Sequence, residues 1–204
     1  MARGSADFVR RALLDGAELR RRSAASLADP AARAADEISR RLAAGGTVFF
    51  FGNGGSASQA QHLAAELTGR FKRERQGLAA VALGANAGEL TSIANDYDFE
   101  ECFERPLSAL VRRGDVAVGL TGSGGSANVA RALRAARAKG AFSIALTSAA
   151  KDARGGPVGR AADLALIAPC RTVAEAQEIH LAVGHILCEL IENRLAVPVR
   201  RKGK

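Results

Sequence analysis

The sequence is poor in aromatic and sulfur-containing residues. It has no tryptophan, one tyrosine and one methionine, and aromatic residues make up 4% of its 204 positions. Because bases stack on aromatic side chains in many nucleic-acid sites, this composition disfavours a nucleic-acid partner. The three cysteines (Cys102, Cys170 and Cys188) are widely spaced. This spacing argues against a cysteine zinc site and a disulfide framework, and it is typical of reduced thiols.

Long apolar runs are also missing. No stretch approaches the roughly 18 consecutive apolar residues of a membrane span. The N-terminal segment has no apolar signal core, and its arginines alternate with Asp7, Asp15 and Glu18, unlike those of a transit peptide. The hydrophobic share of 48% and the charged share of 25% are typical of a globular domain. We therefore expect a cytoplasmic protein with no membrane partner.

Positive charge is in excess, with a formal net charge of +8. A positive protein favours anionic substrates or partners. Much of the excess positive charge lies in the run 20–22 and in the tail 200–204. Such runs of charged residues usually form a solvated face of the protein. Together with the low aromatic content, this pattern favours a small anion over nucleic acid.

Residues 47–70 combine a strand, a glycine turn and a helix. The apolar run 48–51 predicts a buried strand, and the turn 52–56 contains three glycines. We expect Ser56 to be the N-cap of the following helix. A helix N-terminus directly after a strand presents free N–H groups and a positive dipole end, which suit a phosphate.

His62 and Glu66 lie four residues apart and therefore share one face of this helix. One interpretation is a single site that binds a phosphate and transfers protons beside it; the other is a solvated ion pair. A second glycine- and hydroxyl-rich turn, 121–126, also follows a predicted strand and precedes a helix. Two such turns at strand ends strengthen the prediction of a phosphate site, although ordinary strand-to-helix turns would look similar.

The apolar periodicity predicts strands alternating with helices along the chain. The expected strands are 48–51, 78–83, 115–120, 142–147 and 164–167, and the expected helices are 6–27, 31–44, 57–67, 89–94, 100–111, 127–138 and 173–195. Such alternation predicts an α/β three-layer sandwich with a parallel sheet covered on both faces. We expect Asp29-Pro30 to separate the first two helices. These two form an arm that either contacts another subunit or covers the sheet.

The last predicted helix carries Gln177, His180 and His185. At about 100° per residue, Gln177 can share a face with either histidine, whereas the two histidines point apart. Periodicity leaves open which histidine faces a site.

Several motifs together resemble one known family. They are Gly52-Asn53-Gly54-Gly55-Ser56 with His62 and Glu66, Ala94-Asn95-Asp96, the run Ser-Gly-Gly-Ser-Ala-Asn-Val at 123–129, and Gln177-Glu178-Ile179-His180 followed by His185. This combination resembles the phosphoheptose isomerase branch of the sugar isomerase (SIS) domain proteins over nearly the whole chain. The resemblance implies a flavodoxin-like five-stranded parallel sheet between helices. It also implies a helical arm (1–45), a SIS domain (46–198), a basic tail (199–204) and a homotetramer with sites between subunits.

The resemblance also assigns roles to residues. It implies zinc bound by His62, Glu66, Gln177 and His185, with Glu66 as the general base and His185 as the general acid. The implied substrate-binding residues are Asn53, Gly54, Gly55, Ser56, Glu66, Arg70, Asn95, Asp96, Thr121, Gly122, Ser123, Ser126 and Gln177, of which 121–123 and 126 match the phosphate loop. The implied reaction converts D-sedoheptulose 7-phosphate to D-glycero-D-manno-heptose 7-phosphate through an enediol, which requires a base and an acid flanking C1 and C2.

Some positions depart from the family pattern. Gly122 and Gly125 stand where relatives often carry threonine and asparagine, and Gly84 replaces a frequent serine. Two alternatives also remain, a non-catalytic SIS protein of the replication-initiator-associating type and a regulator that binds a sugar phosphate. The presence of both Glu66 and His185 favours the enzyme.

Overall fold

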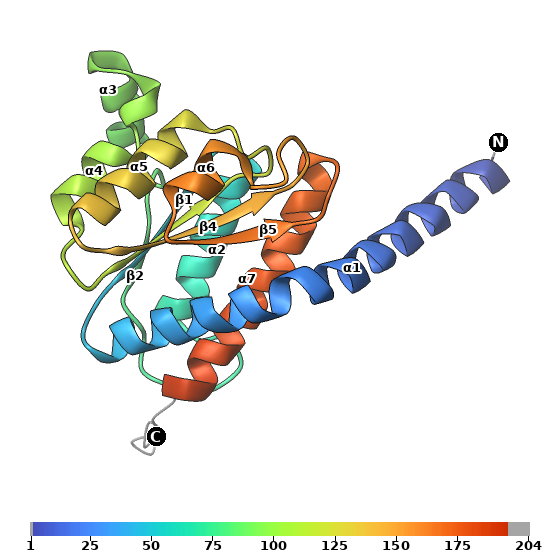
Figure 1. Ribbon diagram of the computed structural model, residues 1–204, viewed down its shortest axis with the longest axis horizontal. Helices are drawn as coiled ribbons and strands as arrows, with labels where there is room; N and C mark the ends of the chain where they lie inside the picture. The colour runs from blue at the N-terminus through green and yellow to red at the C-terminus, as the bar shows by residue number, and fades with distance from the viewer. Residues whose placement is uncertain (1, 196–204) are drawn as a thin grey trace.

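The computed structural model describes residues 2–195 and contains one five-stranded sheet (Figure 1). The strands are β1 (Val48–Gly52), β2 (Ala80–Ala82), β3 (Val116–Leu120), β4 (Phe142–Ser148) and β5 (Leu164–Ala168). All neighbours pair in parallel, in the order β2-β1-β3-β4-β5. This is the flavodoxin-like order, in which a ligand site is expected where β1 and β3 diverge. The predicted fold class is therefore confirmed, with β2 shorter than the predicted strand 78–83.

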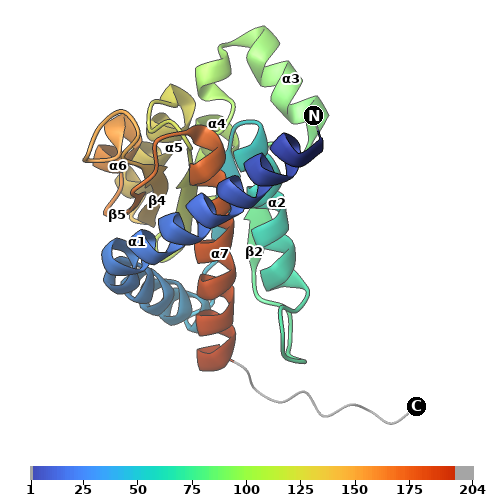
Figure 2. The same ribbon diagram turned by 90° about the vertical axis from the view of Figure 1, so that its right-hand side faces the viewer.

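Helices cover both faces of the sheet (Figures 1 and 2). One face packs against α1 (Ala2–Ala43), α2 (Gly55–Thr68) and α7 (Val173–Leu195), and the other against α4 (Glu104–Leu110), α5 (Ala127–Ala138) and α6 (Gly156–Ala161). The short α3 (Ala87–Asp96) and a 3₁₀ turn (Phe99–Glu101) lie at one end of the molecule. Strands β1 and β3 are buried along their whole length, which explains their uninterrupted apolar sequences.

The prediction of two separate N-terminal helices is wrong. A single helix, α1, runs through Pro30. Proline removes one backbone N–H and crowds the preceding turn, which normally kinks or ends a helix. Here Leu27 and Ala31 are buried on either side of the proline, so packing holds both halves helical. Figure 2 shows the resulting change of direction between the two halves of α1.

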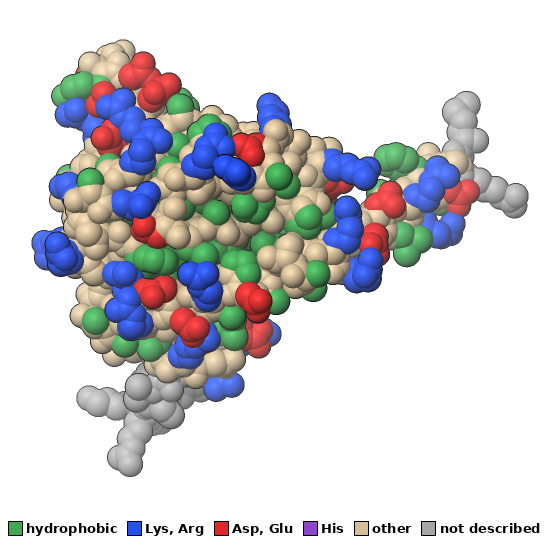
Figure 3. Space-filling model, viewed as in Figure 1, with side chains coloured by type: hydrophobic (Ala, Val, Ile, Leu, Met, Phe, Trp, Pro, Cys, Tyr) green, Lys and Arg blue, Asp and Glu red, His purple; other side chains and the backbone are tan. Residues whose placement is uncertain are grey.

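The two halves of α1 differ in their surroundings. The first half projects beyond the sheet, and its apolar side chains are exposed, including Phe8 at 68% and Leu13 at 71% (Figures 1 and 3). From Leu19 onward the helix packs against α7 and β5. Of the two roles left open by the sequence, covering the sheet is thus confirmed for the second half. The role of the projecting half remains a prediction.

Two further helical segments differ from the predictions. The helix expected over 100–111 is divided, because Pro106 has no N–H to continue hydrogen bonding towards Cys102. The chain instead forms the 3₁₀ turn and then α4. Helix α6 was not predicted, since its six residues are too few to show a periodicity. Among the described residues, no helix is both long enough and apolar enough to cross a bilayer. The predicted basic tail, 199–204, lies outside the described residues.

Candidate active site

The two predicted turns meet around one cavity at the carboxyl ends of β1 and β3. The cavity has a volume of about 160 Å³. Its lining residues come from both turns, the end of β3 and the start of α7: Asn53, Ser56, Leu120, Thr121, Gly122, Ser123, Ser126, Val173 and Gln177. This is the place where the strand order reverses, as the fold predicts for a ligand site.

Three hydroxyl groups gather on the β3 side of this cavity. Thr121 Oγ1 lies 2.9 Å from Ser126 Oγ and 3.4 Å from Ser123 Oγ. Ser126 is the N-cap of α5, yet its hydroxyl makes no capping hydrogen bond. Hydroxyl donors at a helix N-terminus form a suitable environment for a phosphate. The turn 121–126 therefore has the chemistry predicted from its sequence.

The prediction that Ser56 caps α2 is wrong. The helix begins at Gly55 and its N-cap is Gly54, whose φ of +55° is accessible to glycine at little cost. Ser56 lies buried in the first turn, where its N–H donates to the Asn53 carbonyl at 3.0 Å, and the N–H of Ala57 donates to Gly54 at 2.9 Å. Because these N–H groups are already hydrogen-bonded, the first turn contributes mainly the side chains of Asn53 and Ser56 to the cavity.

Asn53 is held in place by Asn128, a residue that the sequence did not single out. The two side-chain amides exchange a pair of 2.9 Å hydrogen bonds. The backbone N–H of Val129 also donates to Asn128 Oδ1, which fixes the orientation of both amides. Asn128 is buried, and it belongs to the motif 123–129, although no role was assigned to it from the sequence.

Glycines allow close contacts on both sides of the cavity. A methyl group at position 55 would overlap the amide of Gln177, with only 2.9 Å to its Cδ. At position 122 it would lie 2.8 Å from Val173 Cγ1, so Val173 occupies the space that a larger side chain would need. Position 125 is open, since the nearest atom, Ser123 Oγ, would be 3.9 Å away. The contact with Val173 explains why position 122 is glycine, whereas position 125 has room for a larger side chain.

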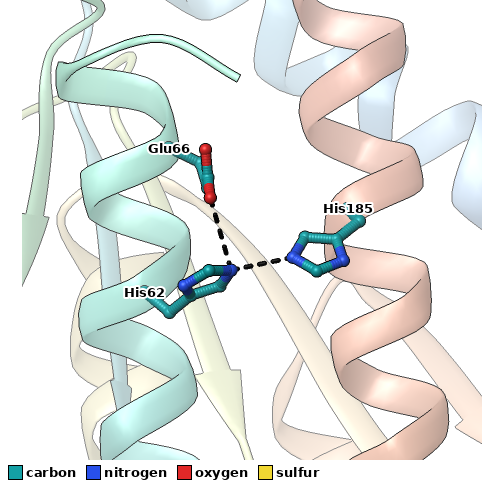
Figure 4. A group of neighbouring side chains, drawn as sticks. All are labelled: His62, Glu66 and His185. Atoms are coloured by element: carbon teal, nitrogen blue, oxygen red, sulfur yellow. Dashed lines mark hydrogen bonds and ion pairs between the residues drawn. The ribbon is translucent and has the colours of Figure 1, made fainter. Parts of the chain in front are cut away.

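His62, Glu66 and His185 form a second part of the site, between α2 and α7 (Figure 4). His62 Nε2 lies 2.8 Å from His185 Nε2 and 3.4 Å from Glu66 Oε1. One ligand atom from each residue lies within 4.8 Å of the other two. Two imidazoles and one carboxylate are ligands typical of zinc. The donor set therefore fits a divalent metal ion.

The two histidines of α7 point in different directions, as the periodicity predicted. His185 faces His62, with 5.0 Å between ring centroids. His180 is 2% exposed, and its Nε2 lies 3.0 Å from the carbonyl oxygen of Thr147. Burial lowers the pKa of His180, and the hydrogen bond with Thr147 offsets this only in part. His180 is thus a neutral core residue, and His185 belongs to the site.

The remaining predicted residues are placed less directly. Gln177 packs against Gly55 and lines the cavity, two turns before His185 on α7. Arg70 is exposed in the segment after α2. Asn95 and Asp96 are exposed at the end of α3, where they hydrogen-bond to each other at 2.8 Å. Within one chain these three exposed residues do not line the cavity, and their contact with substrate stays a prediction.

A buried ion pair lies behind the histidine cluster. Arg75 Nε lies 3.2 Å from Glu192 Oε1, and both side chains are 1% exposed. Burial raises the pKa of Glu192, but three backbone N–H donors and Arg75 outweigh it and hold the pKa below its usual value. Arg75 also donates hydrogen bonds to the carbonyl oxygens of Leu67 and Glu66 in the last turn of α2. No motif predicted this pair, because its two residues are more than a hundred positions apart in the chain.

Comparison with known proteins agrees with this geometry. The family model described as the SIS domain matches residues 15–148. A phosphoheptose isomerase from Rhodospirillum rubrum is 48% identical over 164 residues, which cover 80% of this chain and 85% of that protein. The chain belongs to the phosphoheptose isomerase family of SIS domain proteins. The prediction that it is an isomerase of this family is thereby confirmed.

Solved structures of this family share the fold. The phosphoheptose isomerase GmhA from Neisseria gonorrhoeae superposes with a TM-score of 0.85 at 36% identity, covering 92% of this chain and 98% of that one. A phosphoheptose isomerase from Francisella tularensis gives a TM-score of 0.87 at 30% identity, covering 93% and 98%. The SIS fold is therefore common to this chain and these phosphoheptose isomerases.

Proposed function

We propose that the protein converts D-sedoheptulose 7-phosphate to D-glycero-D-manno-heptose 7-phosphate. The observation that carries the proposal is the meeting of His62 and Glu66 on α2 with His185 on α7, beside a hydroxyl-lined cavity. Membership of the phosphoheptose isomerase family supports the same reaction.

Glu66 and His185 are suited to the two proton transfers of this isomerisation. Glu66 takes the proton from C1 of the ketose while His185 gives a proton to the C2 carbonyl oxygen, which produces the enediol. The aldose then forms when C2 receives a proton and the C1 hydroxyl loses one. One carboxylate oxygen of Glu66 lies 3.4 Å from His62, so the other oxygen is free to face the substrate.

His62, Glu66 and His185 would hold a zinc ion, with Gln177 as the fourth ligand that the family resemblance implies. When bound, a divalent ion polarises a carbonyl and stabilises developing negative charge on oxygen. Gln177 lines the cavity and its amide packs against Gly55, which supports a defined position for this side chain. An amide is a weaker ligand than a carboxylate, so Gln177 would hold the ion less tightly than Glu66.

The hydroxyl groups of Thr121, Ser123 and Ser126 would bind the phosphate. Phosphate bound there would hold the substrate at its far end, so that remote binding energy orients C1 and C2. The family resemblance implies a homotetramer, in which a neighbouring copy would supply the exposed residues Arg70, Asn95 and Asp96 to the site.

Incubation of the purified protein with sedoheptulose 7-phosphate and zinc, followed by detection of the aldose phosphate, tests the proposal. We expect turnover that a chelator abolishes and added zinc restores. Binding of the ketose phosphate without turnover would instead favour the non-catalytic or regulatory SIS protein.

A His185→Ala variant tests the metal assignment separately. Because the change removes one of three clustered ligand groups, we expect loss of both bound zinc and turnover. Zinc content is measured by atomic absorption after dialysis, with His180→Gln as the control that leaves the cluster intact. Full zinc occupancy in the His185→Ala protein would rule out His185 as a ligand.

A further inference from the structure

The Arg75–Glu192 ion pair lies where it can fix the geometry of the site. Both side chains are 1% exposed. A buried ion pair loses its hydration and usually adds little net stability. Its contacts, in contrast, reach both helices that carry the histidine and glutamate cluster. This combination suggests that the pair serves to position other residues.

Arg75 holds the end of α2. Its guanidinium donates hydrogen bonds to the carbonyl oxygens of Glu66 and Leu67, each at 2.8 Å, and of Gly69 at 3.1 Å. These carbonyls belong to the last turn of α2 and its C-cap, where a helix leaves acceptors unsatisfied. The backbone of the proposed base is therefore tied directly to Arg75.

Glu192 holds the segment that follows α2. Its carboxylate accepts hydrogen bonds from the backbone N–H groups of Phe71 at 3.2 Å, and of Lys72 and Arg73 at 2.9 Å each. The phenyl ring of Phe71 stacks on the imidazole of His185, with 5.4 Å between centroids and 22° between planes. Glu192 thus fixes the loop that presses Phe71 against the proposed acid.

We propose that Arg75 and Glu192 are positioning residues that hold His185 in register with His62 and Glu66. Arg75 fixes the last turn of α2, and Glu192 fixes the loop that carries Phe71. The ion pair joins these two parts of the structure. The expected effect on kcat rests on the proposed isomerase function, whereas the expected effect on the position of His185 does not.

The test compares Glu192→Gln with Glu189→Gln. Glu189 is a matched control because it lies one turn earlier on α7 and binds the side chain of Lys72, at 2.8 Å, and not the loop backbone. The chain has three histidines, so its imidazole carbon-bound protons give a simple NMR spectrum. Phe71 shields His185 through its ring current, and Phe71→Leu defines the signal shift that loss of the stack produces.

In metal-free protein, we expect Glu192→Gln to shift the His185 signal in the same direction as Phe71→Leu, and Glu189→Gln to leave it unchanged. We also expect weaker zinc binding and a kcat about 10- to 100-fold lower, as for small misplacements of catalytic groups, with KM near the wild-type value. A folded Glu192→Gln protein with an unmoved His185 signal and normal kcat would overturn the proposal.

One outcome separates this inference from the proposed function, and a second variant covers the case in which Glu192→Gln does not fold. If the wild type lacks turnover but Glu192→Gln still shifts the His185 signal, the isomerase assignment fails and the positioning role stands. If Glu192→Gln does not fold, Phe71→Leu decides, because it removes the stack and leaves the ion pair intact. Unchanged zinc affinity and kcat in Phe71→Leu would then overturn the proposal.

Discussion

The carboxylate of Glu66 is the group on which the proposed chemistry depends most directly. Its side chain is 21% exposed and lies 3.4 Å from His62, so it is open to a substrate on one side and oriented on the other. We expect Glu66→Gln to lower kcat by about 10²- to 10⁴-fold, the usual contribution of a general base, and to spare substrate binding. Calorimetric titration with the ketose phosphate and a kcat measurement check both parts. Activity near the wild-type level would assign the base to another residue.

Because Gly55 has no side chain, it leaves the space that the Gln177 amide occupies. Alanine at this position would overlap the Gln177 amide and force it away from the cavity. We expect Gly55→Ala to lower kcat/KM by about tenfold or more, because displacement of a substrate-positioning group by a fraction of an ångström is costly. Gly125→Ala is the control, since its new methyl group would meet no atom closer than 3.9 Å. Equal kinetics for the two variants would show that the Gln177 position does not matter.

Some residues act through a contact with a residue far away in the sequence. Their roles could not be predicted from the sequence. His62 and Glu66 share a helix face, and the hydroxyls of 121–126 share a turn, so spacing made them candidates and the family resemblance assigned their roles. Asn128, on α5, has a role only because its side chain hydrogen-bonds to that of Asn53, which follows β1. Glu192 matters only because the loop after α2 folds back onto α7. Such pairings arise from tertiary packing, which spacing along the chain does not encode.

Helices and strands were predictable where one local rule dominated. Helices α5 and α7 have the predicted bounds, because their apolar periodicity is uninterrupted. Helix α1 was divided wrongly because the local rule for Pro30 was outweighed by burial of Leu27 and Ala31. The start of α2 was misplaced by two residues, because Gly54, with its conformational freedom, is the N-cap in place of Ser56. Tertiary packing and glycine torsions thus account for these errors.

His180 joins α7 to β4 and gives the fold a pH dependence. Its pKa is lowered by burial, so below pH 6.5 the unfolded chain binds a proton that the folded chain does not. The associated stability is present above the unfolded pKa and is lost progressively as pH falls from that value through the lower pKa of the folded state. We expect His180→Gln, which keeps a donor for Thr147, to show a smaller drop in melting temperature between pH 7.5 and pH 5.5 than the wild type. Thermal unfolding of metal-free protein checks this, and parallel pH profiles would contradict it.

The whole molecule presents a projecting arm beside an apolar groove. The groove, of about 440 Å³, lies between α1 and α7 and is lined mainly by alanine, leucine, isoleucine and valine side chains. The arm itself exposes Phe8, Val9, Leu13 and Leu14. Contiguous apolar surfaces of this kind usually mark a contact with another protein chain. We expect the contacts of the proposed homotetramer to lie on these surfaces of the first and last helices.

A double change of Leu13→Asp and Leu14→Asp tests this assembly. Charged residues on an apolar interface lose hydration without gaining partners, so we expect a mass below four times that of the 21.1 kDa chain by light scattering. Arg10→Ala is the control, because it changes only a surface ion pair with Asp7 on the same arm. If a neighbouring copy supplies Arg70, Asn95 or Asp96 to the site, turnover falls together with the mass. A dissociated protein with full turnover would instead mean that one chain holds the complete site, and an unchanged mass would place the interface away from the arm.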